Sequence, residues 1–228
     1  MPDTNAPAPS APGLAEPSKT RPVLLSDPRV AAIPVRDSGE PLTELGESFG
    51  SSRALVRVSV ARRLALARAG LPEGLGLRVI DGYRTAAAQH AIIRSYTDEL
   101  LVFHRAVGAA ELERLTSRFV APMAVAPHVA GAAVDLTLVD SAGRELDLGT
   151  PVDATPEQSG GACYFDAPQA GRHARANREL LAQVLRGAGL VNYPTEWWHW
   201  SYGDRYWALM TGATAAVYGP VGRDQVAR

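Results

Sequence analysis

Apolar residues recur at helical spacing in several stretches of this chain. The predicted helices cover Ser52–Ala69, Ala86–Arg105, a shorter segment that ends at Arg118, and Ala174–Gly187. Gly70 is expected to stop the first of them, and the Thr85 side chain can cap the second. The pattern therefore predicts helices spread over most of the chain.

Strand patterns lie between these helices. The expected strands are Leu75–Tyr83, the alternating part of HVAGAAVDLTLVD, Glu145–Leu148 after the hairpin turn DSAGRE, and a final strand EWWHWSY, Glu196–Tyr202. Helices grouped around a mostly antiparallel central sheet make an α+β fold. A length of 228 residues fits a single domain.

The first 22 residues differ from the rest in composition. They are rich in Pro, Ala and Ser, so we expect a disordered tail over residues 1–22 and one globular domain over residues 23–228. The tail lacks the basic start and apolar core of a secretory signal. No apolar run approaches the roughly 18 residues that cross a bilayer. The expected protein is cytoplasmic, with no membrane partner.

Net charge and cysteine content exclude further kinds of partner and site. A net charge of −1 leaves no electrostatic footprint for nucleic acid, so none is expected as a partner. Cys163 is the one cysteine, which rules out an intrachain disulfide and a thiolate cage for a metal. A nucleophilic Cys163 is the alternative to a structural one, but its neighbours in SGGACYFD offer no partner at hydrogen-bonding spacing.

The five histidines divide into two groups. His90 and His104 share one face of a predicted helix without an acidic partner at metal spacing, so they are expected to be structural or solvent-facing. His173 opens a helix in a charged stretch and is expected to be exposed. This leaves His128 and His199 as candidates for chemistry.

His128 stands seven residues before Asp135, and Gly131 permits a bend between them. A carboxylate in the middle of a strand is costly unless it is paired or bound to a cation. The bend can bring both side chains to one point, as metal ligation requires. An Asp135 that faces water from the strand is the alternative interpretation.

His199 would complete the ligand set. Two imidazoles and a carboxylate leave one tetrahedral position open, as in catalytic zinc sites. Glu196 is the candidate general base for a water in that position. In a flat strand residues i and i+3 face opposite ways, so this role requires a bend near Pro194–Trp197. A surface glutamate at a strand start is the alternative.

Two further groups can complete the site. Arg84 follows a predicted strand, where it can stabilise a developing oxyanion, although alone it would be an ordinary surface arginine. Strand alternation places Trp197 on the side of His199, where its indole would flank the site. The same alternation directs Trp198 and Trp200 towards the core.

In these motifs the chain resembles the VanX-like zinc-dependent D-alanyl-D-alanine dipeptidases. IDGYRT, HVAGAAVD followed by LTL, and EWWHW occur in the family's order, between about Leu75 and Tyr206. The family signature is roughly Ser-x-His-x-x-Gly-x-Ala-x-Asp and then Glu-x-Trp-His. The matching residues are His128, Gly131, Ala133, Asp135, Glu196, Trp198 and His199. The combination is far more specific than any single part.

The resemblance implies an α+β zinc dipeptidase with one Zn²⁺ per chain. His128, Asp135 and His199 would bind the ion, Glu196 would act as base and then as acid, and Arg84 would stabilise the tetrahedral intermediate. In the family, an Asp in a Gly-x-x-x-Asp context contacts the ammonium group of the dipeptide. GTPVD places Asp153 there, and an unpaired carboxylate would select a free amine.

The chain also departs from the family. Ala126 replaces the Ser before the first His, and the tyrosine that some members place over the substrate has no counterpart before Arg62. The expected substrate is D-Ala-D-Ala or a closely similar free dipeptide. One alternative is a D,D-carboxypeptidase or endopeptidase on cell-wall peptides, against which Asp153 and the missing export signal argue. The other is a non-catalytic zinc-binding module of the same fold, against which Glu196 and Arg84 argue.

Overall fold

A four-stranded antiparallel sheet forms the centre of the molecule, in the strand order β3-β4-β6-β5. The computed structural model describes residues 22–222, so the predicted tail lies outside the described residues except for Pro22. The sheet strands are β3 Leu75–Asp81, β4 Ala133–Asp140, β5 Val191–Asn192 and β6 His199–Ser201. A separate antiparallel pair joins β1 Leu42–Glu44 to β2 Leu55–Arg57.

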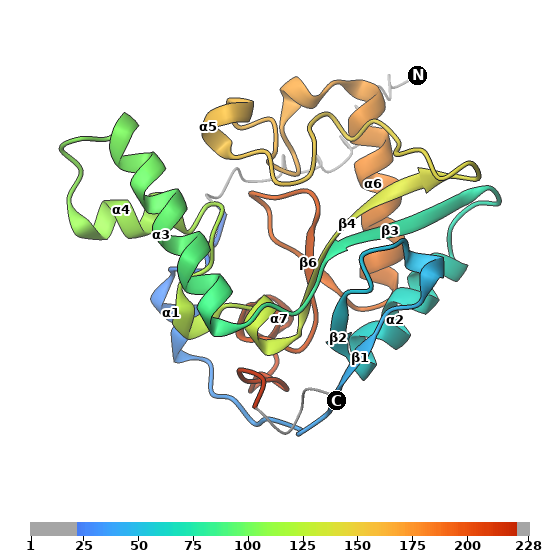
Figure 1. Cartoon of the computed structure of the whole chain (residues 1–228), viewed down its shortest axis with the longest axis horizontal. Helices are drawn as coiled ribbons and strands as arrows, with labels where there is room; N and C mark the ends of the chain where they lie inside the picture. The colour runs from blue at the N-terminus through green and yellow to red at the C-terminus, as the bar shows by residue number, and fades with distance from the viewer. Residues whose placement is uncertain (1–21, 223–228) are drawn as a thin grey trace, which may run out of the picture.

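Helices cover both sides of this sheet. The α-helices within residues 22–222 are α1 Pro28–Ala32, α2 Val58–Ala69, α3 Ala86–Phe103, α4 Ala109–Thr116, α5 Pro156–Ser159, α6 Arg172–Gly187 and α7 Arg205–Thr211. Short 3-10 helices are η1 Glu47–Phe49, η2 Met123–Val125, η3 His128–Ala130 and η4 Pro168–Ala170. The pair α2 and α6 lies on one side of β4 and β6, and α3 with α4 lies on the other (Figure 1). The α+β prediction is confirmed.

The central strand β4 separates the core from the polar face. Val134, Leu136 and Leu138 are fully buried in the main hydrophobic cluster, together with residues of α2 and α6. Burying each such side chain contributes about 1.5–3 kcal/mol, which fixes the orientation of the strand. Because side chains alternate along a strand, Asp135 and Thr137 project from the opposite face.

The helix predicted from Ser52 begins instead at Val58, because residues 55–57 form β2 against β1. The contacts of Arg57 explain why a strand, and not the start of the helix, is found at these residues. Its fully buried guanidinium donates to the carbonyl oxygens of Ala130 and Gly219, at 2.8 and 3.1 Å. These partners lie far away in the sequence, so local spacing does not reveal them.

The predicted strand Glu145–Leu148 is wrong. Only an isolated bridge joins Glu145 to Val139, and the Leu146 amide donates to the Leu138 carbonyl at 2.9 Å. The segment then leaves the sheet.

Other predicted elements are present in the structure, namely β3, α3 and α6. Thr85 caps α3, because its side chain accepts a hydrogen bond from the Ala88 amide.

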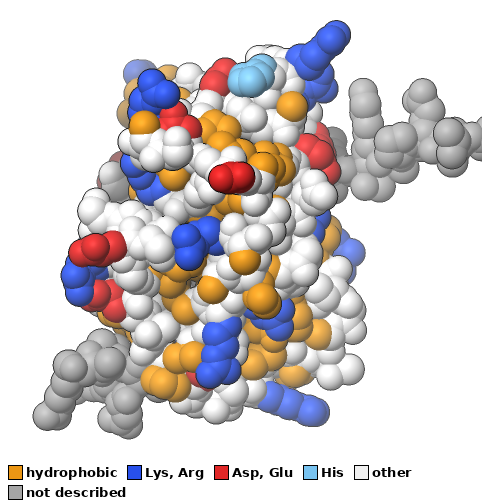
Figure 2. All heavy atoms as spheres, turned by 90° about the vertical axis from the view of Figure 1, so that its right-hand side faces the viewer, with side chains coloured by type: hydrophobic (Ala, Val, Ile, Leu, Met, Phe, Trp, Pro, Cys, Tyr) orange, Lys and Arg blue, Asp and Glu red, His pale blue; other side chains and the backbone are white. Residues whose placement is uncertain are grey.

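Charges are dispersed on the side of the molecule that Figure 2 shows. Basic side chains are separated there by acidic, apolar and neutral groups and do not gather into one patch.

Within residues 22–222, every helix is too short or too polar to cross a bilayer.

Candidate active site

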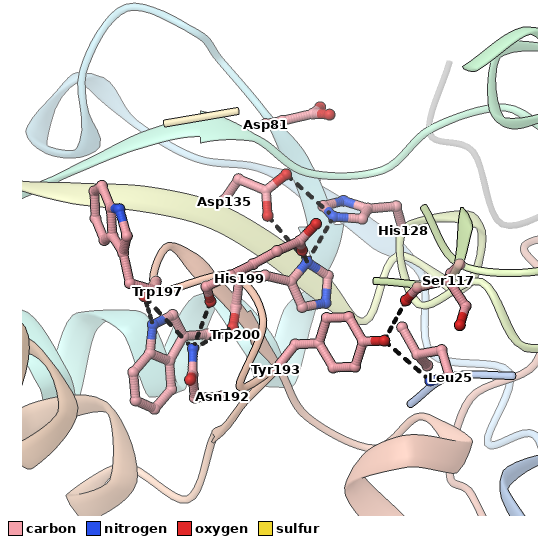
Figure 3. Close-up of polar contacts among 12 residues, drawn as sticks. Leu25, Asp81, Ser117, His128, Asp135, Asn192, Tyr193, Trp197, His199 and Trp200 are labelled. Carbon is pink, nitrogen blue, oxygen red and sulfur yellow. Dashed lines mark hydrogen bonds and ion pairs between the residues drawn. The ribbon is translucent and has the colours of Figure 1, made fainter. Parts of the chain in front are cut away.

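His128, Asp135 and His199 point towards one another at the centre of the sheet (Figure 3). Asp135 on β4 and His199 on β6 are directly paired residues, and His128 lies on η3, just before β4. One ligand atom from each residue lies within 4.8 Å of the others. The exposed fractions are only 5% for both histidines and 2% for Asp135. The structure thus brings the three predicted ligands together.

Hydrogen bonds orient these side chains for cation binding. Nδ1 of His128 lies 2.6 Å from the Gly82 carbonyl oxygen, so it carries the proton and leaves Nε2 as the ligand atom. That Nε2 is 3.1 Å from Nδ1 of His199 and 3.3 Å from Oδ2 of Asp135. Nδ1 of His199 is 3.0 Å from Oδ1 of Asp135. Two imidazole nitrogens and one carboxylate oxygen suit Zn²⁺.

The electrostatics agree with this donor set. Burial alone would raise the pKa of Asp135, but charge interactions and hydrogen bonds with His128 and His199 hold it well below its ordinary value. Burial also lowers the pKa of His199, although Asp135 opposes that shift. An ionised carboxylate beside a neutral imidazole is the state that binds a cation.

Glu196 enters the site from a turn. The Glu196 amide donates to the Tyr193 carbonyl, and the His199 amide donates to the Glu196 carbonyl at 3.3 Å. Residues 194–198 therefore form turns, and only His199–Ser201 of the predicted strand Glu196–Tyr202 is extended. The expected bend is confirmed, whereas the long strand is wrong. Oε2 of Glu196 lies 3.8 Å from Nδ1 of His199.

The environment of Glu196 favours its protonated form. Burial raises the pKa of Glu196 well above its ordinary value, the Asp135 and Asp153 carboxylates add to the shift, and Arg84 opposes it. A raised pKa makes the carboxylate of Glu196 a stronger proton acceptor than an ordinary carboxylate.

Arg84 lies between two carboxylates. Its Nε donates to Oδ2 of Asp81 at 2.5 Å, and its Nη2 donates to Oδ2 of Asp135 at 3.1 Å. A β-bulge between Val79 and Asp81 makes Asp81 the cross-strand partner of Asp135, so one guanidinium can reach both. Asp81 was not among the predicted site residues. Its position three residues before Arg84 in IDGYRT is the available signal.

A cavity of about 230 Å³ opens at this cluster. Its lining consists of Leu25, Arg84, Gln89, Ile92, Phe119, Val120, Ala121, His128, Asp135, Asp153, Tyr193, Glu196, Trp198 and His199. The charged groups and the apolar side chains together make a pocket for a small amphipathic molecule. Gln89 and Tyr193 were not predicted as site residues, because only the tertiary fold brings them here.

Asp153 also lines the cavity. Its backbone has a left-handed conformation, with a φ of 63°. Desolvation by the cavity walls and repulsion from Asp135 raise the pKa of Asp153 to about 6, against the attraction of Arg84. The residue as a whole remains exposed, so water offsets part of that desolvation. Asp153 is thus a carboxylate at an open part of the pocket.

Trp197 does not flank the site as predicted. It points away from the histidine cluster, its Nε1 donates to Oγ1 of Thr150 at 2.8 Å, and its ring lies beside the Arg178 guanidinium (Figure 3). Trp198 lines the cavity instead. The prediction assumed strand alternation, which does not hold inside a turn. Trp200 is fully buried in the core, as expected.

Cys163 is fully buried, and burial raises the pKa of its thiol. Its carbonyl oxygen accepts a hydrogen bond from the Trp197 amide at 3.0 Å. This supports a structural role, because a nucleophilic cysteine needs an accessible thiolate.

Known proteins are similar to this chain in sequence. The profile of the Peptidase_M15 family, described as D-ala-D-ala dipeptidase, matches residues 45–213. The D-alanyl-D-alanine dipeptidase of Synechocystis sp. (strain ATCC 27184 / PCC 6803 / Kazusa) is 28% identical over 216 residues, which cover 78% of this chain and 87% of that relative. The D-alanyl-D-alanine dipeptidase of Escherichia coli (strain K12) is 33% identical over 126 residues, which cover 55% and 54%.

Two solved structures also match this chain at low sequence identity. VanYB in complex with D-Alanine-D-Alanine is 17% identical with a TM-score of 0.44, and the match covers 78% of this chain and 91% of that chain. The vancomycin resistance D,D-pentapeptidase VanY in complex with Zn(II) is 18% identical with a TM-score of 0.39, covering 81% and 90%.

Proposed function

The chain belongs to the D-ala-D-ala dipeptidase family of metallopeptidases, and we propose that it hydrolyses D-alanyl-D-alanine or a closely similar free dipeptide with one Zn²⁺ per chain. The observation that carries the proposal is the convergence of His128, Asp135 and His199 with Glu196 in one buried cavity. The names of the two dipeptidase relatives support the choice of substrate.

His128, Asp135 and His199 would hold the Zn²⁺. The donor set fits that ion, because the Gly82 carbonyl fixes the tautomer of His128 and the three ligand atoms already lie together. When bound, the ion supplies Lewis acidity, which polarises a peptide carbonyl and lowers the pKa of a water.

Glu196 moves the proton in the proposed reaction. Its carboxylate takes a proton from the attacking water and then gives it to the nitrogen of the departing residue. Water adds across the peptide bond, the C–N bond breaks, and two amino acids leave. The raised pKa of Glu196 makes its carboxylate a better acceptor for the proton of the attacking water.

Arg84 stabilises the negative charge that develops on the carbonyl oxygen. Its hydrogen bonds to Asp81 and Asp135 use Nε and Nη2, so Nη1 can donate to a substrate oxygen. The two carboxylates also keep the guanidinium in place before the substrate arrives, which is the arrangement that lowers a barrier most effectively.

Asp153 binds the free ammonium group of the dipeptide. Its carboxylate has no ion-pair partner within residues 22–222 and lies at the open part of the cavity, so it attracts a charged amine and penalises a blocked one. Selection of a free amine distinguishes a dipeptidase from a D,D-carboxypeptidase or endopeptidase. The substrates of those enzymes carry an acylated nitrogen where the dipeptide has its ammonium group. The predicted cytoplasmic location would supply free dipeptides and stays a prediction.

Hydrolysis assays with two ligands test the proposal. Purified protein reconstituted with Zn²⁺ is expected to release D-alanine from D-Ala-D-Ala, to work poorly on its N-acetyl form, and to lose activity with a chelator. Strong hydrolysis of the acetylated form would support the carboxypeptidase alternative instead. Stoichiometric zinc without turnover of either ligand would support the non-catalytic module.

A further inference from the structure

Glu157 is a mostly buried carboxylate that lies outside the lining of the cavity and has no part in the proposed reaction. It belongs to α5, and its side chain is 14% exposed. We propose that Glu157 is a positioning residue for the substrate: it ties α5 to α3 and α4, and so fixes Asp153 relative to the cavity wall that these helices carry. The inference rests on the proposed dipeptidase function, in which Asp153 binds the ammonium group.

Two donors from α3 and the end of α4 meet the Glu157 carboxylate. The buried Tyr96 hydroxyl on α3 donates to Oε2 at 2.5 Å, and the Arg118 guanidinium, just after α4, donates to Oε1. Burial alone would raise the pKa of Glu157, but the Tyr96 hydrogen bond and the Arg118 charge hold it below its ordinary value. The carboxylate is therefore ionised at neutral pH, which makes both hydrogen bonds charge-assisted and strong.

The helices that hold Glu157 also carry part of the cavity wall. Ile92 of α3 lines the cavity, and so does Phe119, which follows α4. The Tyr96 ring packs against Phe119 with 4.9 Å between the ring centroids, and Phe119 lies 6.5 Å from the Trp198 ring, which also lines the cavity. The donor that binds Glu157 is thus in direct contact with the wall. Figure 1 shows α3 and α4 as an arm beside the sheet, with α5 above it.

A short and rigid segment joins Glu157 to Asp153. Thr155 and Pro156 between them are buried, and the ring of Pro156 fixes its own φ. Thr155 closes a capping box, in which its Oγ1 accepts from the Gln158 amide and its own amide donates to Oε1 of Gln158, both at 3.2 Å. A movement of Glu157 would therefore be passed on to Asp153 and not absorbed between them.

Other contacts hold the two ends of the loop that carries Asp153. Nε1 of Trp197 donates to Oγ1 of Thr150 at 2.8 Å, and Arg178 donates to the Ala162 carbonyl at 2.8 Å. The bonds of Glu157 differ from these, because they join the middle of the loop to α3 and α4 and not to the main core. Their loss should free the middle of the loop while its ends stay in place.

Kinetics of Tyr96→Phe test this role. The substitution removes the hydroxyl and keeps a ring against Phe119. We expect KM for D-Ala-D-Ala to rise by about three- to tenfold, a fraction of the effect of removing the Asp153 charge, while kcat stays within about twofold. The rate on N-acetyl-D-Ala-D-Ala should change far less. Glu157→Gln keeps the shape but removes the charge, and should shift KM in the same direction.

A double-mutant cycle shows whether the effect passes through Asp153. In Asp153→Asn the charge that binds the amine is gone, so adding Tyr96→Phe should change KM by less than about twofold. An equal rise of KM in both backgrounds would overturn the proposal, because Tyr96 would then act independently of Asp153. A fall in kcat with an unchanged KM would overturn it as well, since the substrate would still be held correctly.

Tyr218→Phe is the matched control for lost stability. Tyr218 is also buried, and its hydroxyl donates to a carboxylate oxygen, Oε2 of Glu40, at 2.5 Å, outside the cavity lining. Both variants should lower the midpoint of urea unfolding by similar amounts, but KM should rise in Tyr96→Phe alone. A comparable rise of KM in Tyr218→Phe would contradict the proposal, because general loosening of the fold would then account for it.

Amide hydrogen exchange tests the attachment of α5 without any substrate. The amides of Ser159 and Gly161 are hydrogen-bonded within the α5 turn at 2.9 Å. They should exchange faster in Tyr96→Phe than in wild type or in Tyr218→Phe, and unchanged exchange would overturn the inference. The proposed function fails by a different result, namely wild-type protein that binds zinc but cleaves no D-Ala-D-Ala.

Discussion

Oε2 of Glu196 lies 3.8 Å from Nδ1 of His199 because a tight turn joins the two residues. In an extended strand these side chains would project from opposite faces. Nδ2 of Asn192 donates to the carbonyl oxygens of both Glu196 and His199 at 2.9 Å, which holds the turn closed. The proposed base and one proposed metal ligand therefore stand side by side.

Replacing Glu196 should abolish turnover without removing the metal. In Glu196→Gln and Glu196→Ala we expect kcat to fall by about 10²–10⁴-fold, since a positioned acid–base group contributes that much. Zinc content should stay at one ion per chain, because the ligands are untouched. Steady-state kinetics and metal analysis measure both quantities. Glu179→Gln, at an exposed glutamate, is the control, and a near wild-type rate for Glu196→Ala would refute the mechanism.

Replacing Asp153 should weaken the selection for a free amine. In Asp153→Asn we expect KM for D-Ala-D-Ala to rise by about 10- to 100-fold, because hydrogen bonds to charged groups contribute about 1.5–3 kcal/mol. The rate on N-acetyl-D-Ala-D-Ala should change far less. Asp166→Asn, at an exposed aspartate outside the cavity lining, serves as the matched control. Unaltered preference for the free dipeptide would remove Asp153 from the binding site.

The affinity for the dipeptide should depend on pH through the same residue. Desolvation and Asp135 raise the pKa of Asp153 to about 6, so its carboxylate is charged above that pH and neutral below it. KM should therefore rise as the pH falls through about 6, with water at the exposed rim moving the midpoint lower. A KM profile between about pH 5 and about pH 8 measures this. In Asp153→Asn the profile should become flat, and an unchanged slope there would assign the titration to another group.

Removing Arg178 should destabilise the whole fold. This buried guanidinium donates to the carbonyl oxygens of Leu148, Ala162, Tyr164 and Phe165. In Arg178→Met these acceptors lose their donor, so we expect the free energy of unfolding to drop by at least about 3 kcal/mol. Urea unfolding measures the change. The exposed Arg175→Met should stay within about 0.5 kcal/mol of wild type.

Elements with a local signal were predictable from the sequence. Thr85 marks the start of α3, and the alternation around Asp135 marks β4, because capping and side-chain period act over a few residues. The segment at residues 55–57 was misassigned, since it is held in a strand by its pairing with β1 and by the distant Ala130 carbonyl that accepts from Arg57. Trp197 was misplaced for a related reason, because the turn at Glu196 cancels the alternation on which the prediction relied.

The candidate site also combines residues that the sequence revealed with residues that only the tertiary structure revealed. Motif spacing identified His128, Asp135 and His199, and the fold brings their ligand atoms within 4.8 Å. Spacing did not reveal Asp81, whose position depends on a β-bulge. Nor did it reveal Gln89, which joins the cavity lining only when α3 is packed against residue 121. Side chains that act through burial need the tertiary structure to be recognised.

The pairing of β4 with β6 has a consequence for the mechanical strength of the sheet. β6 is only three residues long, yet it connects β5 to the rest of the sheet. Asp135 and His199 face each other across that short pairing, so an ion held by both would act as a cross-link between the strands. A slip of one residue would turn Asp135 away and open the cross-link. Zinc would then resist sliding of β6, and its removal should loosen the sheet first at this strand.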